Sequence, residues 1–247
     1  MDLAAEAANT AIAVLDWSPA GAQAHHIQVS IIDDILVDAV GGAARTGIDC
    51  PLGWPEEFVR FLGAWSAGTL VPPANTDKAW RRGLAYRRTD EVVRERLGVV
   101  PLSVAADRIA HPAMRCAGIL ARLAADGVPV DELVVEAYPA GSLKCWGLPY
   151  RRYKGAANAP ARDALVDELL TRAPWLDLGE HESLCRASDH ALDAVLASLT
   201  ARAAALDLTV PPAPEDAALA AKEGWIALPT GPLSDLAPER GGPPPAS

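Results

Sequence analysis

Three short apolar segments of this chain each end on an acidic residue, and a proline or glycine follows within a few residues of each acid. The acids are Asp16 after residues 11–15, Asp49 after a very short apolar stretch, and Glu136 after residues 131–135. Short apolar runs bounded by turn residues are typical of buried strands. Ligands of an open α/β sheet gather at the carboxyl ends of its strands, so adjacent strands would bring these three carboxylates together.

Two further acids, Asp189 and Asp193, lie four residues apart in the segment SDHALDA, which puts both on one face of a helix. Carboxylates that share a few ångströms repel one another unless a cation compensates them. Mg²⁺ and Mn²⁺ prefer oxygen ligands, and two such ions activate water and stabilise the leaving oxygen in phosphodiester cleavage. The pattern therefore predicts one or two of these ions at Asp16, Asp49, Glu136, Asp189 and Asp193. The alternative for each acid taken singly is a turn former or a helix cap.

The remaining pattern predicts an α/β domain over residues 1–229, with a mainly helical insertion at about 56–130. Residues 230–247 are rich in proline and glycine and are predicted to form a disordered tail. A second strand is expected at 26–31. Helices are expected at 33–40, 56–66, 88–97, 111–126, about 160–172 and about 188–206.

Composition excludes several classes of protein. The formal net charge is −10, which argues against broad, non-specific binding of nucleic acid because such binding needs a basic face. The four cysteines form no CxxC pair, which excludes a zinc knuckle and a dense disulfide framework. The chain has no long uncharged apolar run and no basic stretch of a signal peptide at its start, so we expect a cytoplasmic protein that does not bind a membrane.

Several segments occur in an order that is typical of one family. The segments are GIDCPLGWP (47–55), RRTD (87–90), PLSVAADRI (101–109), VEAYPAGSLKCWGL (135–148), YKG (153–155) and SDHALDAVLASLTA (188–201). Over roughly residues 11–229 the chain resembles the domain-of-unknown-function 429 family, predicted ribonuclease-H-like nucleases.

The resemblance implies a ribonuclease-H-like mixed sheet flanked by helices, whose acids bind two metal ions. Carried over, Asp16 takes the place of the acid of the first strand, although Leu15-Asp16-Trp17-Ser18 lacks the glycines of the family's turn. Asp49 takes the place of the acid after a later strand, and Asp193 with Asp189 supplies the acids of the last helix. Glu136 is a further ligand or a general base.

Four basic residues lie in the shared segments: Arg87, Arg88, Lys144 and Lys154. An arginine offers a phosphate two donors, and a lysine steadies developing negative charge. We therefore expect Arg88, Lys144 and Lys154 to bind substrate, and Lys154 to act with Asp49 and Glu136 in catalysis. For Arg87 and Arg88 the alternative is ion pairing with neighbouring acids on a solvated helix face.

The leading hypothesis is a divalent-metal-dependent phosphodiesterase that acts on nucleic acid or on a small phosphodiester. One alternative is an ATP-using phosphotransferase on a related sheet, although the sequence contains no glycine-rich phosphate loop. The other is a non-catalytic interaction module in which the carboxylates are structural. The sequence leaves the substrate and the oligomeric state open.

Overall fold

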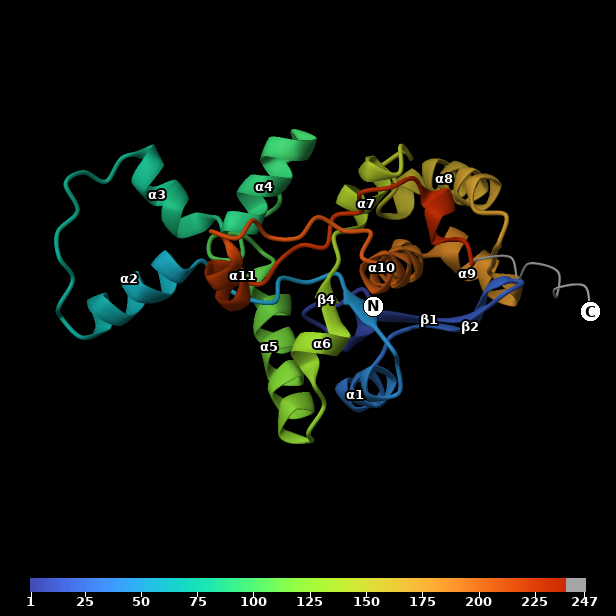
Figure 1. Ribbon diagram of the computed structural model, residues 1–247, viewed down its shortest axis with the longest axis horizontal. Helices are drawn as coiled ribbons and strands as arrows, with labels where there is room; N and C mark the ends of the chain where they lie inside the picture. Colours follow the sequence, from blue (N-terminus) through green and yellow to red (C-terminus); the bar gives the residue numbers. More distant parts are fainter. Residues whose placement is uncertain (239–247) are drawn as a thin grey trace, which may run out of the picture.

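The computed structural model describes residues 1–238 and shows a mixed α/β fold in which helices flank two small hydrogen-bonded sheets (Figure 1). The strands are β1 (Ala11–Ser18), β2 (Gly21–Val29), β3 (Thr46–Ile48), β4 (Val134–Glu136) and β5 (Leu176–Asp177). The helices are α1 (Asp33–Gly41), α2 (Glu56–Ser66), α3 (Lys78–Ala85), α4 (Arg88–Leu97), α5 (Ala110–Ala125), α6 (Val130–Leu133), α7 (Pro139–Cys145), α8 (Ala159–Arg172), α9 (Glu182–Ala187), α10 (Asp189–Ala205) and α11 (Ala217–Glu223).

The first sheet is a hairpin extended by one short strand. β1 and β2 pair antiparallel, with a register shift between Val14 and Leu15, and β5 pairs parallel to β2. The second sheet consists of β3 and β4, which run parallel. The strands are therefore in mixed orientation, as predicted, although they do not form one continuous ladder.

The N-terminal segment connects the two sheets. Asp2 pairs antiparallel with Ala11, at the start of β1, and parallel with Asp49, directly after β3. The backbone bonds are Asp2 N to Ala11 O at 2.9 Å, Ala11 N to Asp2 O at 3.0 Å, and Asp49 N to Met1 O at 2.9 Å. Met1 and Asp2 thus lie between β1 and β3 and bridge them through isolated backbone pairs.

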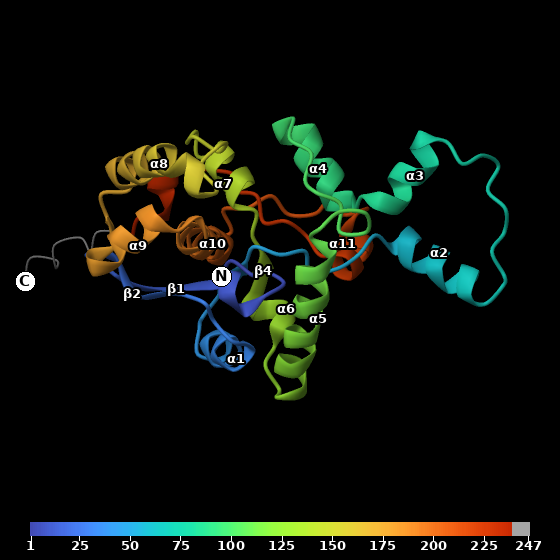
Figure 2. The same ribbon diagram turned by 180° about the vertical axis from the view of Figure 1, so that it is seen from behind.

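Helix α10 packs across this junction and is almost wholly buried along its length. It contacts β1, β3, α7 and α9. In both views α7, α8, α9 and α10 lie on one side of the β1–β2 hairpin and α1 lies on the other (Figures 1 and 2). The apolar side chains accordingly form two main cores, one around α10 and α8 and one that joins α1, β3 and α5.

Between β3 and β4, in the part of the chain where the sequence predicts a helical insertion, the structure contains the helices α2 to α6. Helices α2, α4 and α5 lie where the pattern places them, and α3 is an additional helix that the sequence analysis did not predict. Together α2, α3 and the loop between them form an arm that extends away from the rest of the molecule (Figure 1). No side chain of α2 or α3 is fully buried.

Two segments differ from their predictions. Residues 131–133, expected to begin a strand, instead belong to the single helical turn α6, because Pro129 begins the turn and two acids occupy its first positions. The strand β4 is therefore only three residues long. Within the expected tail, Leu233 and Leu236 are buried in a 3₁₀ helix, η4 (Leu233–Leu236), and residues 239–247 lie outside the described residues.

The close contact between β3 and α10 depends on Gly47. A Cβ atom at this position would lie 2.1 Å from the backbone oxygen of Ala197, so any side chain would push the strand away from the helix. We predict that Gly47→Ala lowers the free energy of unfolding by about 1–3 kcal/mol or more through overpacking. Urea denaturation followed by circular dichroism measures the change.

A matched control is Gly41→Ala, at the end of α1, where an added Cβ atom would meet nothing within 4 Å. Alanine favours a helix over glycine, so this variant should be as stable as the wild type or slightly more stable. Equal stability of the two variants would contradict the tight packing of β3 on α10.

Candidate metal centre

Three aspartates from distant parts of the chain meet at the junction of the two sheets. They are Asp2 in the N-terminal segment, Asp49 directly after β3, and Asp193 in the second turn of α10. Each offers a carboxylate oxygen, and these oxygens all lie within 4.8 Å of one another. We call these three residues the aspartate triad.

Local structure fixes each member of the triad. The ladder bonds described above hold Asp2 and Asp49 side by side on neighbouring strands. Ser188 caps α10 by accepting a hydrogen bond from the backbone nitrogen of Ala191, at 3.3 Å, which sets where the helix begins. Asp193 then lies one turn into the helix and is directed at the ends of the strands.

The triad is an electrostatically unfavourable arrangement in the absence of a cation. The side chains of Asp2, Asp49 and Asp193 are 12%, 20% and 2% exposed, so water solvates them poorly. Burial raises the pKa of Asp193 to about 6 and raises the pKa of Asp49 well above its usual value. The nearby carboxylate of Asp2 raises both further, because like charges oppose ionisation.

Lys154 supplies partial compensation. Its Nζ lies 2.6 Å from a carboxylate oxygen of Asp193 and 3.9 Å from one of Asp49. Although burial opposes its charge, these two carboxylates raise the pKa of Lys154 above the usual value of a lysine. The lysine side chain is still half-exposed, so a charged group on a reachable surface faces two of the three acids.

Two further side chains orient the triad. The hydroxyl of Tyr153 donates to Asp193 Oδ1 at 2.8 Å, and Nδ1 of His190 lies 2.6 Å from Asp2 Oδ2. The hydrogen bond to Asp2 raises the pKa of His190, which favours the imidazolium form. The sequence analysis did not predict a role for Tyr153, and it missed Asp2.

Asp189, a predicted ligand, has a different role. Its carboxylate accepts a hydrogen bond from the backbone nitrogen of Gly155 at 3.1 Å. Buried Arg162 holds the same loop by donating to the backbone oxygens of Tyr153 and Gly155 at 3.0 and 3.2 Å. Asp189 and Arg162 together position the loop that carries Tyr153 and Lys154.

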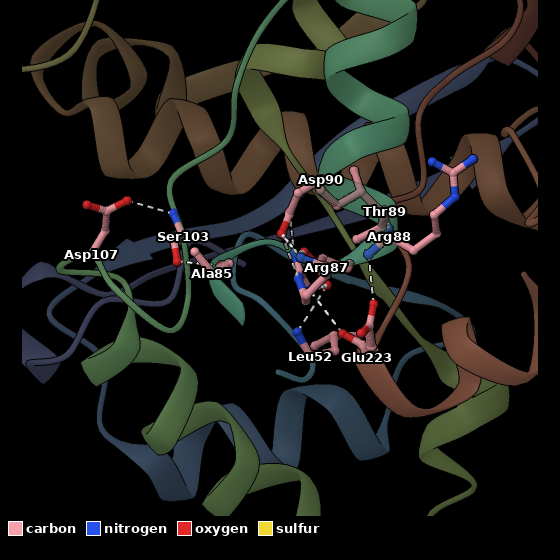
Figure 3. A network of polar contacts seen from close by, with 11 residues as sticks. Leu52, Ala85, Arg87, Arg88, Thr89, Asp90, Ser103, Asp107 and Glu223 are labelled. Atoms are coloured by element: carbon pink, nitrogen blue, oxygen red, sulfur yellow. Dashed lines mark hydrogen bonds and ion pairs between the residues drawn. The ribbon is translucent and has the colours of Figure 1, made fainter. Parts of the chain in front are cut away.

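Glu136 lies in a second buried cluster of charges, around Arg87, which Figure 3 shows with Asp90 and Glu223 labelled beside it. The guanidinium of Arg87 donates to both carboxylate oxygens of Glu136, each at 2.7 Å, and also binds Asp90 at 3.0 Å. The backbone nitrogen of Leu52 donates to Glu136 as well, at 3.0 Å. The charge of Glu136 is therefore already compensated by a two-pronged ion pair, and this glutamate is not part of the aspartate triad.

The Arg87 cluster connects the helical insertion to the sheet. Arg87 precedes α4, Glu136 ends β4, and the backbone oxygen of Glu223 in α11 accepts from Arg87 at 3.1 Å. The carboxylate of Glu223 accepts from the backbone nitrogens of Glu56 and Arg88, each at 2.7 Å. This buried network fixes three segments against one another.

The other predicted site residues lie away from the triad. Asp16 is 69% exposed and lies 3.4 Å from the ring of His25, because β1 carries it to the far end of the hairpin. Arg88 pairs with Asp216 at 3.0 Å and Glu95 at 3.3 Å, which is the solvated ion pairing that the sequence left open. Lys144 donates to the backbone oxygen of Leu97 and lies over the ring of Tyr150.

The missing acid could have been found in part. The lack of glycines around Asp16 was a signal that the acid of the first strand lies elsewhere, and Asp2 follows an apolar residue at the start of the chain. However, a strand of two or three residues has no readable periodicity. Only the pairing of Asp2 with both Ala11 and Asp49 reveals it.

The family comparison agrees with the sequence motifs. The model of the family described as "Protein of unknown function (DUF429)" matches residues 1–217, and the chain belongs to this family. No curated protein and no solved structure matches the chain significantly. Within residues 1–238, no helix combines the length and apolar character needed to cross a membrane.

The two clusters of acids should respond differently to substitution. We predict that Glu136→Gln lowers the free energy of unfolding by about 3–5 kcal/mol, because it leaves Arg87 as a buried charge with one partner fewer. Asp193→Asn should cost far less or stabilise the protein in the absence of a cation, because it removes a poorly compensated charge. Chemical denaturation in the presence of EDTA compares the two variants.

Equal losses of stability in both variants would contradict this distinction between a fully compensated and a poorly compensated cluster. Asp16→Asn, at an exposed position, is the baseline and should leave the free energy of unfolding within about 0.5 kcal/mol of the wild type.

Proposed function

We propose that this protein is a divalent-metal-dependent phosphodiesterase with a ribonuclease-H-like arrangement of its sheet. The observation that carries the proposal is the aspartate triad, with carboxylate oxygens within 4.8 Å of one another at the ends of strands. Asp2, Asp49 and Asp193 are the proposed ligands of one or two Mg²⁺ or Mn²⁺ ions. Asp16, Glu136 and Asp189 are no longer proposed as ligands, because other groups or solvent already satisfy them.

The donor set fits a hard cation. It consists of carboxylate oxygens alone, which suits Mg²⁺ and Mn²⁺ rather than zinc or copper. Lys154 lies near Asp193 and Asp49, and the ring of His190 lies against Asp2, so three carboxylates are compensated by one ammonium and one imidazole. Burial, together with the neighbouring carboxylates, raises the pKa values of Asp49 and Asp193, so their charged forms are poorly stabilised without a further cation. A bound ion would supply a Lewis acid that generates a nucleophile from water and stabilises the leaving oxygen.

The residues around the triad have roles that their contacts support. Tyr153 holds Asp193 by one oxygen, which fixes how the other oxygen is presented. Lys154, half-exposed on a loop beside the acids, would bind a non-bridging phosphate oxygen and neutralise developing charge. His190, held by Asp2, would carry a proton to or from the site.

A second candidate function is a non-catalytic interaction module. One observation favours it: Lys154 lies 2.6 Å from Asp193 and compensates that charge without any ion. In this alternative the triad, Lys154 and Tyr153 form a polar network that fixes the junction of the two sheets. Metal binding discriminates between the two functions.

Catalysis by the triad predicts a sharp contrast between Asp49, which follows β3, and Asp16, which lies within β1. We expect the wild-type protein to cleave single-stranded RNA, single-stranded DNA, branched DNA or a small phosphodiester such as bis(p-nitrophenyl) phosphate when Mg²⁺ or Mn²⁺ is added. Asp49→Asn should lower kcat/KM at least about 100-fold, since it removes a proposed metal ligand. Asp16→Asn, outside the triad, should retain wild-type activity. Cleavage that survives Asp49→Asn would exclude the proposed site.

Metal binding is predicted to depend on the same residues. Isothermal titration calorimetry should detect binding of Mn²⁺ to the wild type, and thermal unfolding should shift upward with the metal concentration, because a ligand of the native state stabilises it. Asp193→Asn should abolish both effects, whereas Asp16→Asn should leave both unchanged. A wild-type protein that binds no Mn²⁺ or Mg²⁺ at millimolar concentration would favour the interaction module.

A further inference from the structure

The loop that carries Lys154 to the triad belongs to the longest stretch of the chain without an acidic residue. Residues 137–162 contain five basic residues and no acid, so all 32 acidic residues but only 17 of the 22 basic residues lie outside this stretch. Four of the five basic residues lie within residues 144–154, which we call the basic segment. A local concentration of positive charge on an otherwise acidic protein attracts anions to that place.

Two arginines of the basic segment have no acidic partner. Arg151 and Arg152 are exposed, and none of the ion pairs within residues 1–238 includes either of them. Arg96 is a third exposed arginine without such a pair in the same residues, near the end of α4. Burial raises the pKa of Cys145, and the charges of Arg96 and Lys144 oppose that rise because both lie near its thiol. The charge of Arg96 therefore adds to that of the basic segment.

Tyr150 gathers the charges of the segment. The centroid of its ring lies 4.9 Å from Nζ of Lys144 and 5.0 Å from the guanidinium carbon of Arg151, and both contacts are attractive. Lys144 also donates to the backbone oxygen of Leu97, the last residue of α4. Helices α4 and α7 lie side by side in both views (Figures 1 and 2). The end of α4, the end of α7 and the loop thus contribute to one basic surface.

The loop is held at both ends. Arg172 donates to the backbone oxygen of Trp146 at 3.2 Å. At the other end, Gly155 donates to Asp189 at 3.1 Å and accepts from Arg162 at 3.2 Å. A loop that is fixed in this way loses little conformational freedom when a ligand binds, which favours affinity.

Arg152 has a backbone conformation that favours glycine. Its φ is 59°, in the left-handed region, where a side chain strains the backbone. In the part of the chain that the structure describes, no ion pair of its side chain offsets this strain. Glycine at this position would remove the charge and relieve the strain together.

The basic segment ends at the aspartate triad. Nζ of Lys154 lies 2.6 Å from a carboxylate oxygen of Asp193. Arg151 is three residues before Lys154, so the two backbones are at most about 11 Å apart. Successive nucleotides of one strand of a duplex rise by about 3.4 Å, so the exposed arginines lie within a few nucleotides of a phosphate held at the triad.

We propose that Arg151, Arg152 and Arg96 bind the phosphate backbone of a single-stranded nucleic acid whose scissile phosphate lies at the triad. Planar guanidinium groups match phosphate oxygens in pairs. A single strand is favoured over a duplex because the basic surface is narrow and the rest of the chain is acidic, whereas a duplex presents the phosphates of two strands. That the strand is a substrate rests on the proposed function, but its binding does not.

The first test measures binding without cleavage. Fluorescence anisotropy in EDTA follows a labelled single strand of about 20 nucleotides, as DNA and as RNA. The double variant Arg151→Gln/Arg152→Gly should raise Kd at least about 10-fold and reduce the slope of log affinity against log salt by about 1.4, or about 0.7 for each lost phosphate contact. Its unfolding temperature should not fall, because glycine relieves the strain at position 152.

The matched control is Arg60→Gln/Arg122→Gln. It removes the same charge from exposed positions on α2 and α5, outside the basic segment, and should leave both Kd and the salt slope close to the wild type. Equal Kd values for the wild type and both double variants would overturn the proposal. A wild type that binds neither strand at micromolar concentration and low salt would also overturn it.

Cleavage separates this proposal from the proposed function. The Arg151→Gln/Arg152→Gly variant should lower kcat/KM for the oligonucleotide at least about 10-fold more than kcat/KM for bis(p-nitrophenyl) phosphate, mainly through KM. Equal effects on both substrates would contradict the use of these arginines for the strand. Binding that depends on the arginines without any cleavage by the wild type would support the binding surface and contradict the phosphodiesterase.

Two competitors test the class of ligand. A duplex of the same sequence that binds as tightly as the single strand would overturn the assignment of a single strand. Polyglutamate that displaces the strand at an equal concentration of charge would identify an acidic polypeptide as the ligand instead.

Discussion

The candidate site depends on the backbone pairing of a very short N-terminal segment. Asp2 exchanges ladder bonds with Ala11, and the carbonyl of Met1 accepts from Asp49, so residues far apart in the sequence become neighbours on adjacent strands. Gly47 lets α10 approach this junction closely enough for Asp193 to reach the two other aspartates. If the segment were displaced, the ends of β1 and β3 would separate and the triad would lose its first member.

The protein compensates its buried acids in two different ways. Glu136 receives both prongs of the Arg87 guanidinium and a backbone donor, which is typical of a structural cluster in a buried location. The triad has a single lysine, which reaches Asp193 closely and Asp49 only at 3.9 Å. This difference in compensation separates acids that hold the fold together from acids that can bind a cation.

The sequence pattern predicted much of the candidate site. Asp49 and Asp193 belong to the triad, and Lys154 lies beside both. Asp16 was chosen because an apolar strand delivers it to a turn, but β1 belongs to the hairpin and carries Asp16 away from β3. The pattern shows where a strand ends but does not show which strand lies next to it. Tyr153 and the support of its loop by Arg162 depend on tertiary contacts that have no signature in the sequence.

The sequence by itself determined the mixed α/β class, the helical insertion, and the two acids Asp49 and Asp193, because apolar periodicity and turn residues are local properties of the chain. Only the tertiary structure decided that Asp2, and not Asp16, lies beside Asp49 and Asp193, and that Glu136 pairs with Arg87. These outcomes depend on which segments become neighbours, and that follows from backbone pairing at Asp2 and from the packing of α10 on β3. An aspartate or glutamate looks the same in the sequence whether its carboxylate faces an arginine, two other carboxylates or water. Its surroundings in the folded protein decide its chemistry.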